Sequence, residues 1–169
     1  MNIALVAHDG RKKELITWVK YNYRTLSEHK LYATGTTGRL IQEALMELDN
    51  TFSNEEKKRE FYNYKVTRLL SGPLGGDQQI GAMIAEGKID VLIFFCDNLI
   101  VQGHQNDVSA LTRLASLYNI AFATNRTTAD MIITSPLLKD WERGDYKPVL
   151  PTAIDNYKNR QVWPYLNYL

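Results

Sequence analysis

The centre of the chain reads Ser71-Gly72-Pro73-Leu74-Gly75-Gly76-Asp77-Gln78-Gln79, between an apolar run at residues 66 to 70 and apolar residues at helical spacing from Ile80 to Ile84. This order predicts a strand, a glycine-rich loop and a helix. Glycines let the backbone turn tightly or approach a ligand, and the free N–H groups at the helix start suit an anion. Asp77 stands at that start, where a carboxylate either caps the helix or takes a proton from a phosphorylated substrate. The loop alone leaves both roles open.

The same succession of strand, polar loop and helix recurs along the chain. Apolar runs of strand length lie at residues 2–7, 31–33, 64–70, 91–95 and 120–123. Apolar residues at spacings near 3.6 predict helices at residues 12–27, 40–48, 80–84, 111–118 and 129–133. Parallel neighbours are joined by right-handed crossovers. The sequence therefore predicts an α/β fold, a three-layer, doubly wound and mainly parallel five-stranded sheet of the flavodoxin or Rossmann kind.

Length and composition indicate one ordinary globular domain spanning residues 1–169. Hydrophobic residues make up 44% and charged residues 23% of the chain, and the net charge is +1 with scattered Lys and Arg. We expect no nucleic-acid partner, because such partners require a basic surface. The chain opens directly on a strand pattern and has no apolar run of membrane-spanning length. We therefore expect no membrane association and a cytoplasmic protein.

Three further features concern the single cysteine and two segments outside the repeating pattern. Cys96 is the only cysteine, which excludes an internal disulfide and a cysteine-based zinc site, and we expect it to be buried. Residues 49–63 form a charged stretch without an apolar stripe, which predicts a solvated insertion. Residues 136–169 are rich in Pro, Trp and Tyr but weakly periodic, so their local structure is not predicted.

Four loops meet at one edge of such a sheet, because parallel strands end together and ligands bind at their carboxyl ends. These loops carry groups suited to phosphate, together with carboxylates and imidazoles: His8, Asp9 and Lys12; Thr34 to Thr37; Ser71, Gly72 and Asp77; and Asp97, His104 and Asp107. Their convergence predicts an active site.

Each piece also has a plainer interpretation. The threonines of Thr34-Gly35-Thr36-Thr37-Gly38 suit a helix cap as well as a phosphate, and Lys12 alone is an ordinary helix charge. Taken together, the loops favour phosphate binding. We expect no metal, since no HxxxH or HxH spacing is present. A receiver domain requires an acidic pair where Asp9 stands beside His8, and the GxGxxG of dinucleotide domains is absent after the first strand.

Five stretches match a known family: Ala4-Leu5-Val6-Ala7-His8-Asp9, Leu31-Tyr32-Ala33-Thr34-Gly35-Thr36-Thr37-Gly38, the glycine loop at 71–79, Gly87-Lys88-Ile89-Asp90-Val91-Leu92-Ile93-Phe94-Phe95 and Ala123-Thr124-Asn125. They lie in residues 1 to 135 and resemble the methylglyoxal synthase family. The resemblance implies that family's fold and the conversion of dihydroxyacetone phosphate to methylglyoxal and inorganic phosphate. It further implies no metal or organic cofactor, and a homohexamer inhibited by phosphate.

The resemblance also implies roles for individual residues. Asp77 matches the family's catalytic base. We assign His104 as a neutral donor to the carbonyl oxygen, Asp107 as a further catalytic residue, and Asp9 and Asp97 as supporting residues. The positions that hold the substrate match His8, Lys12, Thr34, Gly35, Thr36, Thr37, Ser71, Gly72 and His104.

The chain departs from the family pattern in its later part. Asn98 replaces the proline of Asp-Pro-Leu, and Gln105-Asn106 replaces the middle of His-Asp/Glu-Pro-Asp. Residues 49–63 exceed the usual connection, and the tail after Pro136 matches poorly. Arg160 is our candidate for the family's arginine that reaches a neighbouring subunit's phosphate. The alternative function is a regulatory domain that binds a phosphorylated ligand, similar to the allosteric domain of carbamoyl phosphate synthetase.

Overall fold

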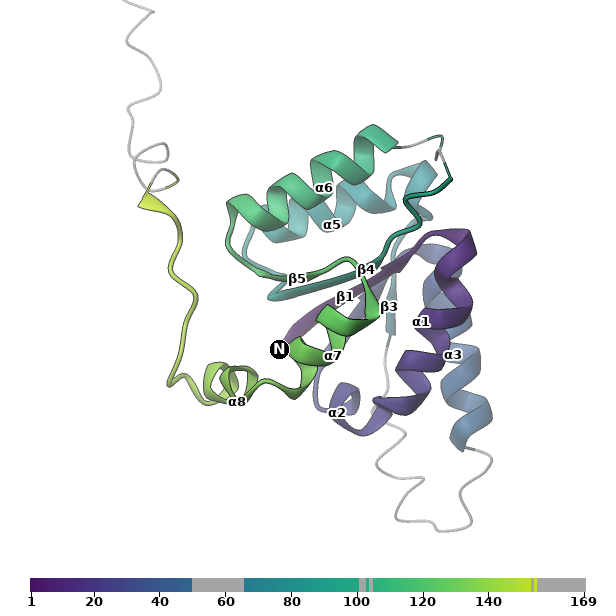
Figure 1. The fold of residues 1–169 in the computed structure, drawn as a ribbon, viewed down its shortest axis with the longest axis horizontal. Coiled ribbons are helices and arrows are strands. Elements are labelled where there is room, and N and C mark those ends of the chain that lie inside the picture. The colour runs from purple at the N-terminus through teal and green to yellow at the C-terminus, as the bar shows by residue number, and fades with distance from the viewer. Residues whose placement is uncertain (50–65, 101–102, 104, 153, 155–169) are drawn as a thin grey trace, which may run out of the picture.

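A computed structural model describes residues 1–49, 66–100, 103, 105–152 and 154 of the chain. Within these residues, five strands form one parallel sheet in the order β3-β2-β1-β4-β5 (Figure 1). The strands are β1 (Asn2–Ala7), β2 (Lys30–Ala33), β3 (Val66–Arg68), β4 (Val91–Phe95) and β5 (Ala121–Ala123). The central strand β1 pairs with β2 and β4, so that Ile3 lies opposite both Leu31 and Val91.

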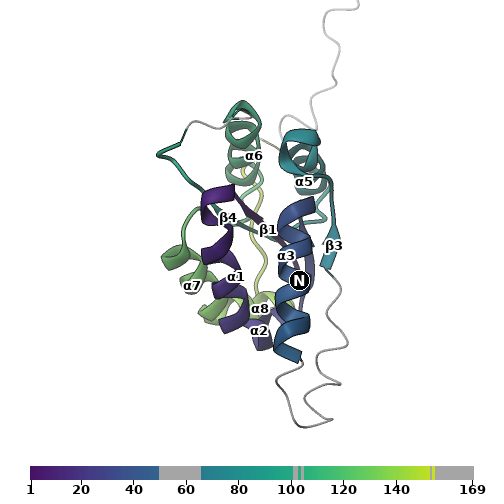
Figure 2. The same cartoon turned by 90° about the vertical axis from the view of Figure 1, so that its right-hand side faces the viewer.

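Helices cover both faces of the sheet, because β1 is apolar on both sides. Ile3 and Leu5 belong to one hydrophobic core, which α1 (Lys12–Tyr21), α3 (Gly35–Asp49) and α7 (Arg126–Thr134) complete. Ala4 and Val6 belong to a second core on the other face, under α5 (Gly76–Ala85) and α6 (Gln105–Leu117). Figure 2 shows the two layers of helices on either side of the sheet. The predicted three-layer, doubly wound fold is confirmed.

Several local predictions need correction. The helix expected at residues 12–27 is broken at Asn22 into α1 and α2 (Tyr23–Ser27), where the Asn22 side chain donates to the carbonyl oxygen of Trp18 at 3.0 Å. Such a local bond offers the backbone an alternative to the continued helix. The helices expected at 40–48, 80–84, 111–118 and 129–133 all begin earlier than their apolar residues indicated, at Gly35, Gly76, Gln105 and Arg126. Cys96 is half-buried rather than buried, and its partial burial still raises the pKa of its thiol to about 11.

The last described part of the chain contains a helix that the sequence pattern did not predict. This helix, α8 (Pro136–Arg143), begins where the Ser135 side chain accepts a hydrogen bond from the Leu137 N–H at 3.3 Å. Its Trp141 packs edge to face with Tyr146, with ring centroids 6.3 Å apart. Arg160 and most of the predicted insertion lie outside the described residues.

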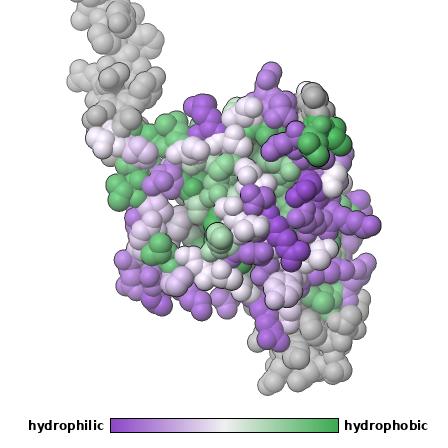
Figure 3. All heavy atoms as spheres, in the orientation of Figure 1, coloured by the Kyte–Doolittle hydropathy of each residue, from purple (hydrophilic) through white to green (hydrophobic). Residues whose placement is uncertain are grey.

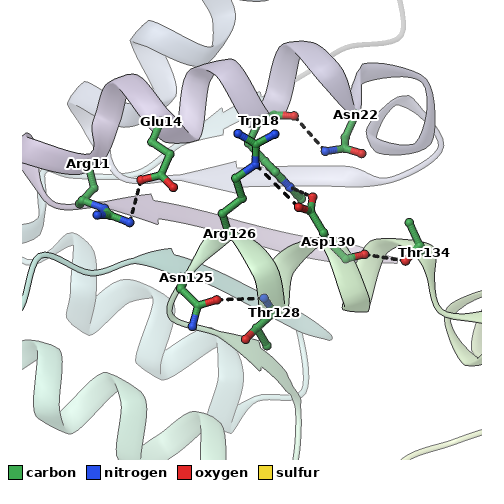
Figure 4. A network of polar contacts seen from close by, with 9 residues as sticks. All are labelled: Arg11, Glu14, Trp18, Asn22, Asn125, Arg126, Thr128, Asp130 and Thr134. Carbon is green, nitrogen blue, oxygen red and sulfur yellow. Dashed lines mark hydrogen bonds and ion pairs between the residues drawn. The ribbon is translucent and has the colours of Figure 1, made fainter.

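Helix α1 is held against α7 by a buried indole. Trp18 is completely buried, and its Nε1 donates to Asp130 at 2.6 Å (Figure 4). The same carboxylate lies 3.7 Å from Arg126 at the start of α7. A buried indole N–H needs such an acceptor. The bond fixes the helix whose first residue, Lys12, reaches the edge of the sheet where the strands end.

Candidate active site

A cavity of about 580 Å³ opens at the carboxyl edge of the sheet. Its walls come from the segments that follow β1, β2 and β3, and from the starts of α5 and α6. The predicted site residues that line it are His8, Asp9, Lys12, Thr34, Thr36, Thr37, Ser71, Gly72, Asp77 and Asp107. Val6, Ala7, Pro73, Phe94 and Gly103 also line it. The cavity therefore brings together residues from all four loops singled out in the sequence.

His8 is held rigidly at the end of β1. Its imidazole is 4% exposed and lies edge-on against Phe94, with ring centroids 4.9 Å apart. Its backbone N–H donates to the carbonyl oxygen of Phe95 at 3.2 Å. Its Nδ1 accepts a hydrogen bond from the backbone N–H of Asp97 at 2.8 Å. Ring and backbone are thus both fixed by the neighbouring strand β4 and by Asp97, two residues beyond its end.

Lys12 brings a cation to the cavity. The short 3-10 turn η1 (Asp9–Arg11) leads from β1 into α1, and Lys12 Nζ donates across it to the Asp9 carboxylate. The Lys12 side chain is mostly buried, whereas that of Asp9 is almost fully exposed. Because the Asp9 carboxylate is open to solvent, which screens the pair, this ion pair contributes about 0 to 1 kcal/mol. A phosphate entering the cavity can therefore compete for the ammonium at little cost.

The threonine loop packs directly on the glycine loop. The Gly35 N–H donates to the carbonyl oxygen of Leu70 at 2.9 Å, and a Cβ on Gly35 would lie 3.1 Å from the backbone nitrogen of Ser71. Gly35 itself does not line the cavity, so its contribution is this close approach of two backbones. Thr36 is exposed and Thr37 is buried, and both line the cavity at the start of α3.

The glycine loop needs two of its glycines for steric reasons. It forms a short turn, η2 (Gly72–Leu74), and then passes through Gly75 with a φ of 106°, in the left-handed region that favours glycine. A Cβ on Gly76 would lie only 2.1 Å from the carbonyl oxygen of Leu70. The Gln79 side chain accepts a hydrogen bond from the Leu70 N–H at 2.9 Å and ties the helix back to the loop.

Asp77 lies in the first turn of α5, with its side chain buried to 2% exposure on the cavity wall. The N-cap position is occupied by Gly75, and no side chain caps the helix there, so Asp77 is not the N-cap residue. The N-terminus of a helix favours the ionised form of a carboxylate. Asp107 occupies the corresponding first turn of α6. Two carboxylates at helix starts therefore border one cavity.

Comparison with known proteins identifies the family. The family model of the MGS-like domain matches residues 14–124. A methylglyoxal synthase of Maridesulfovibrio salexigens is 56% identical over 163 residues, which are 95% of this chain and 97% of that relative. The chain belongs to the methylglyoxal synthase family. A methylglyoxal synthase of Proteus mirabilis is 54% identical over 136 residues, 80% of this chain and 78% of the relative.

A solved structure supports the family at the level of the fold. The crystal structure of methylglyoxal synthase from Elizabethkingia anophelis matches with a TM-score of 0.75 and 39% identity, over 96% of this chain and 93% of that one. The chain is accordingly an enzyme, a carbon–oxygen lyase with a phosphorylated substrate. Because methylglyoxal synthases match it over nearly its whole length, the regulatory-domain alternative is set aside.

Of the residues expected from the methylglyoxal synthase resemblance, the structure does not place Gly35, Asp97 or His104 on the cavity. Asp97 is absent from the lining and instead contacts His8 through its backbone N–H. His104 lies outside the described residues. Phe94, which the sequence analysis treated only as part of an apolar strand, lines the cavity and packs on His8. Its position at the carboxyl end of the most apolar strand was the available signal.

The described part of the chain offers neither a helix for crossing a membrane nor a cluster of side chains for holding a metal ion. No helix there is long and apolar enough to cross a membrane. Likewise, no group of three or more His, Cys, Asp or Glu side chains within those residues could hold a metal ion.

Proposed function

We propose that the chain converts dihydroxyacetone phosphate to methylglyoxal and inorganic phosphate. The observation that carries this proposal is the position of Asp77, whose buried carboxylate lines the same cavity as Lys12, Thr36 and Thr37. A base and a set of phosphate-binding groups therefore border one space. This is the arrangement that a reaction on a small phosphorylated ketone requires.

The reaction needs one proton abstraction and one elimination. Asp77 removes a proton from the hydroxymethyl carbon beside the ketone, and the electron pair left behind forms an enediolate with the carbonyl. The enediolate then collapses, the C–O bond to phosphate on the other side of the carbonyl breaks, and its electrons leave with the phosphate. The hydroxyl proton of the substrate leaves with the phosphate, and the remaining enolate takes up the proton held by Asp77 at its methylene carbon and becomes methylglyoxal. Atoms and electrons balance without an oxidant or reductant.

The phosphate-binding groups set the outcome of that collapse. Elimination requires the C–O bond to phosphate to stand roughly perpendicular to the enediolate plane, so that the π electrons overlap with it. Lys12, the hydroxyls of Thr36 and Thr37, and the N–H groups of Ser71 and Gly72 would hold this torsion and receive the charge of the leaving group. All five residues line the cavity.

Two histidines donate hydrogen bonds to oxygens of the substrate in this proposal. His104 donates to the carbonyl oxygen, as the family resemblance implies, and His8 is a second donor near the carbonyl or the phosphate. Asp107, in the first turn of α6, completes the catalytic set, with Asp9 in support.

Methylglyoxal release tests the function directly. The purified protein is incubated with dihydroxyacetone phosphate and a chelator, and methylglyoxal and phosphate are measured together. We expect equal amounts of both products. Phosphate release without methylglyoxal would indicate a phosphatase, and no turnover of this substrate would refute the proposal.

We also propose that the chain is one cytoplasmic domain that assembles as a homohexamer inhibited by phosphate. Large apolar side chains are exposed, among them Leu74 in the glycine loop and Leu99 after β4, which is 97% exposed. Figure 3 shows apolar side chains at the surface among polar ones. Exposed apolar groups of this kind suit a contact between subunits.

Truncation tests whether the C-terminal tail takes part in assembly. Removing the residues after Asp155, which include Arg160, should give smaller, folded and weakly active species in light scattering. If Arg160 contacts a neighbour's phosphate, ligand binding and assembly are linked, and phosphate inhibition should weaken as well. A truncated chain that stays hexameric with normal phosphate inhibition would contradict this role.

A further inference from the structure

The hydrogen bond between Asp97 and His8 determines the protonation of the imidazole. A backbone N–H can only donate, so the Nδ1 of His8, 2.8 Å from the Asp97 nitrogen, must accept. A proton on Nδ1 would point at the proton of the amide. This excludes, in this arrangement, both the imidazolium and the neutral form that carries its proton on Nδ1. The remaining form is neutral, with the proton on Nε2.

The charged groups around the cavity do not reverse this preference. On the His8 side of the cavity are Asp9 and Lys12, which form an ion pair with one another. Across it, α5 contributes Asp77 and α6 contributes Asp107. The two carboxylates favour an imidazolium and the ammonium opposes it. The Asp97 amide, however, bonds Nδ1 itself, and it cannot turn into an acceptor.

Asp97 is held in the orientation that this bond needs. Its Oδ1 accepts a hydrogen bond from the Leu99 N–H at 3.2 Å, an Asx turn that fixes the peptide after β4. The imidazole is fixed from its own side by Phe94 and by its backbone bond to Phe95. Neither partner can readily rotate away, so the bond persists as the substrate changes charge.

We propose that the backbone of Asp97 locks His8 as a neutral imidazole with its proton on Nε2, so that His8 is a permanent hydrogen-bond donor and Asp97 a positioning residue. This role of His8 adds to the proposed function, and it rests on that function for the identity of the substrate oxygen that receives the hydrogen bond. His8 then stabilises the developing negative charge of the enediolate or phosphate without giving up its proton. His8 therefore needs no reprotonation between turnovers, and it adds no step to the pH profile of kcat.

Nuclear magnetic resonance of the full-length protein labelled with ¹⁵N-histidine tests the lock without any activity. The chain has three histidines, and loss of one signal set in His8→Gln assigns that of His8. We expect a pyrrole-type Nε2 and a pyridine-type Nδ1, both unchanged between about pH 5 and pH 8, where an unrestrained imidazole titrates. A protonated Nδ1, or a His8 signal that titrates in this range, would overturn the proposal.

Substitutions of Asp97 separate positioning from mere folding. Asp97→Asn keeps a side-chain oxygen for the Leu99 N–H and should preserve the His8 spectrum. Asp97→Ala loses the Asx turn, so the His8 signals should begin to titrate and a new step should enter the pH profile of kcat. A His8 spectrum that is unchanged in Asp97→Ala would show that the side chain of Asp97 has no positioning role.

Two substitutions of His8 test the donor role. The amide nitrogen of Gln reaches the position of Nε2, whereas that of Asn reaches the position of Nδ1. Removing a donor from a developing oxyanion lowers kcat about 10²-fold to 10³-fold, so His8→Asn should show this loss and His8→Gln at least tenfold less. Equal losses would refute the donor role. Failure of the proposed function would look different: the protein would form no methylglyoxal from dihydroxyacetone phosphate, while the His8 signals would still be those expected.

Discussion

Replacing Asp77 with asparagine distinguishes a catalytic base from a structural carboxylate. Asparagine has nearly the same size but cannot take the proton, and a positioned general base contributes about 10²-fold to 10⁴-fold. At 1.36 kcal/mol per factor of ten, this corresponds to about 3 to 5 kcal/mol of activation free energy. The contribution of Asp77 to the free energy of unfolding is smaller, since a carboxylate in the first helical turn contributes about 0.3 to 1 kcal/mol through the helix dipole. A domain of ordinary stability, about 5 to 15 kcal/mol, stays folded after that loss.

The two effects are measured separately. Steady-state methylglyoxal formation gives kcat, and urea unfolding of the same preparation gives the free energy of unfolding. Glu86→Gln is the matched control, because Glu86 is an exposed carboxylate at the opposite end of α5. We expect a large loss of kcat and a near-normal midpoint for Asp77→Asn, and neither change for the control. Near-normal turnover of Asp77→Asn would refute the role of Asp77 as the catalytic base and would show that it is a structural residue.

Three further predictions address the phosphate site, the core and the pH dependence. Replacing both Thr36 and Thr37 with valine should weaken substrate and phosphate affinity together in inhibition assays, whereas unchanged phosphate inhibition would locate the phosphate elsewhere. Asp130→Ala should lower the free energy of unfolding by about 1 to 3 kcal/mol, because it strands the buried N–H of Trp18; an unchanged urea midpoint would contradict this. Burial lowers the pKa of His29 below its ordinary value of 6.5, so the unfolded chain binds the proton more readily. This contribution to stability is present above about pH 6.5 and is lost as the pH falls, and His29→Gln should flatten the pH dependence of unfolding below about pH 6.5.

The sheet and the cavity lining could be predicted because both follow from patterns along the chain. Apolar residues on both sides of β1 and β4 indicate strands covered on two faces, and topology then brings the segments after parallel strands to one edge. This rule alone places His8, Thr36 and Asp77 around one space. The residue types alone suggested phosphate and proton chemistry.

The orientation of side chains within the site could not be predicted in the same way. The bond from Asp97 to His8 is made by a backbone group of a residue 89 positions away, and no sequence pattern encodes it. The resemblance suggested that the carboxylate of Asp97 lies near the reacting centre, whereas in the structure the backbone N–H of Asp97 contacts the imidazole of His8. The break at Asn22 was missed because the apolar spacing continues across it while a side-chain bond interrupts the helix.

The topology also explains how a cavity with so few cations can receive a dianion. Among the described residues that line it, Lys12 is the only cation. However, α3, α5 and α6 all start at this edge, because each follows a strand of a parallel sheet. Their N-terminal N–H groups supply partial positive charge that no side chain has to carry. The same field draws negative charge toward the phosphate end of the substrate. In our proposed mechanism, expulsion of phosphate from the enediolate moves charge in the direction that these helix starts favour.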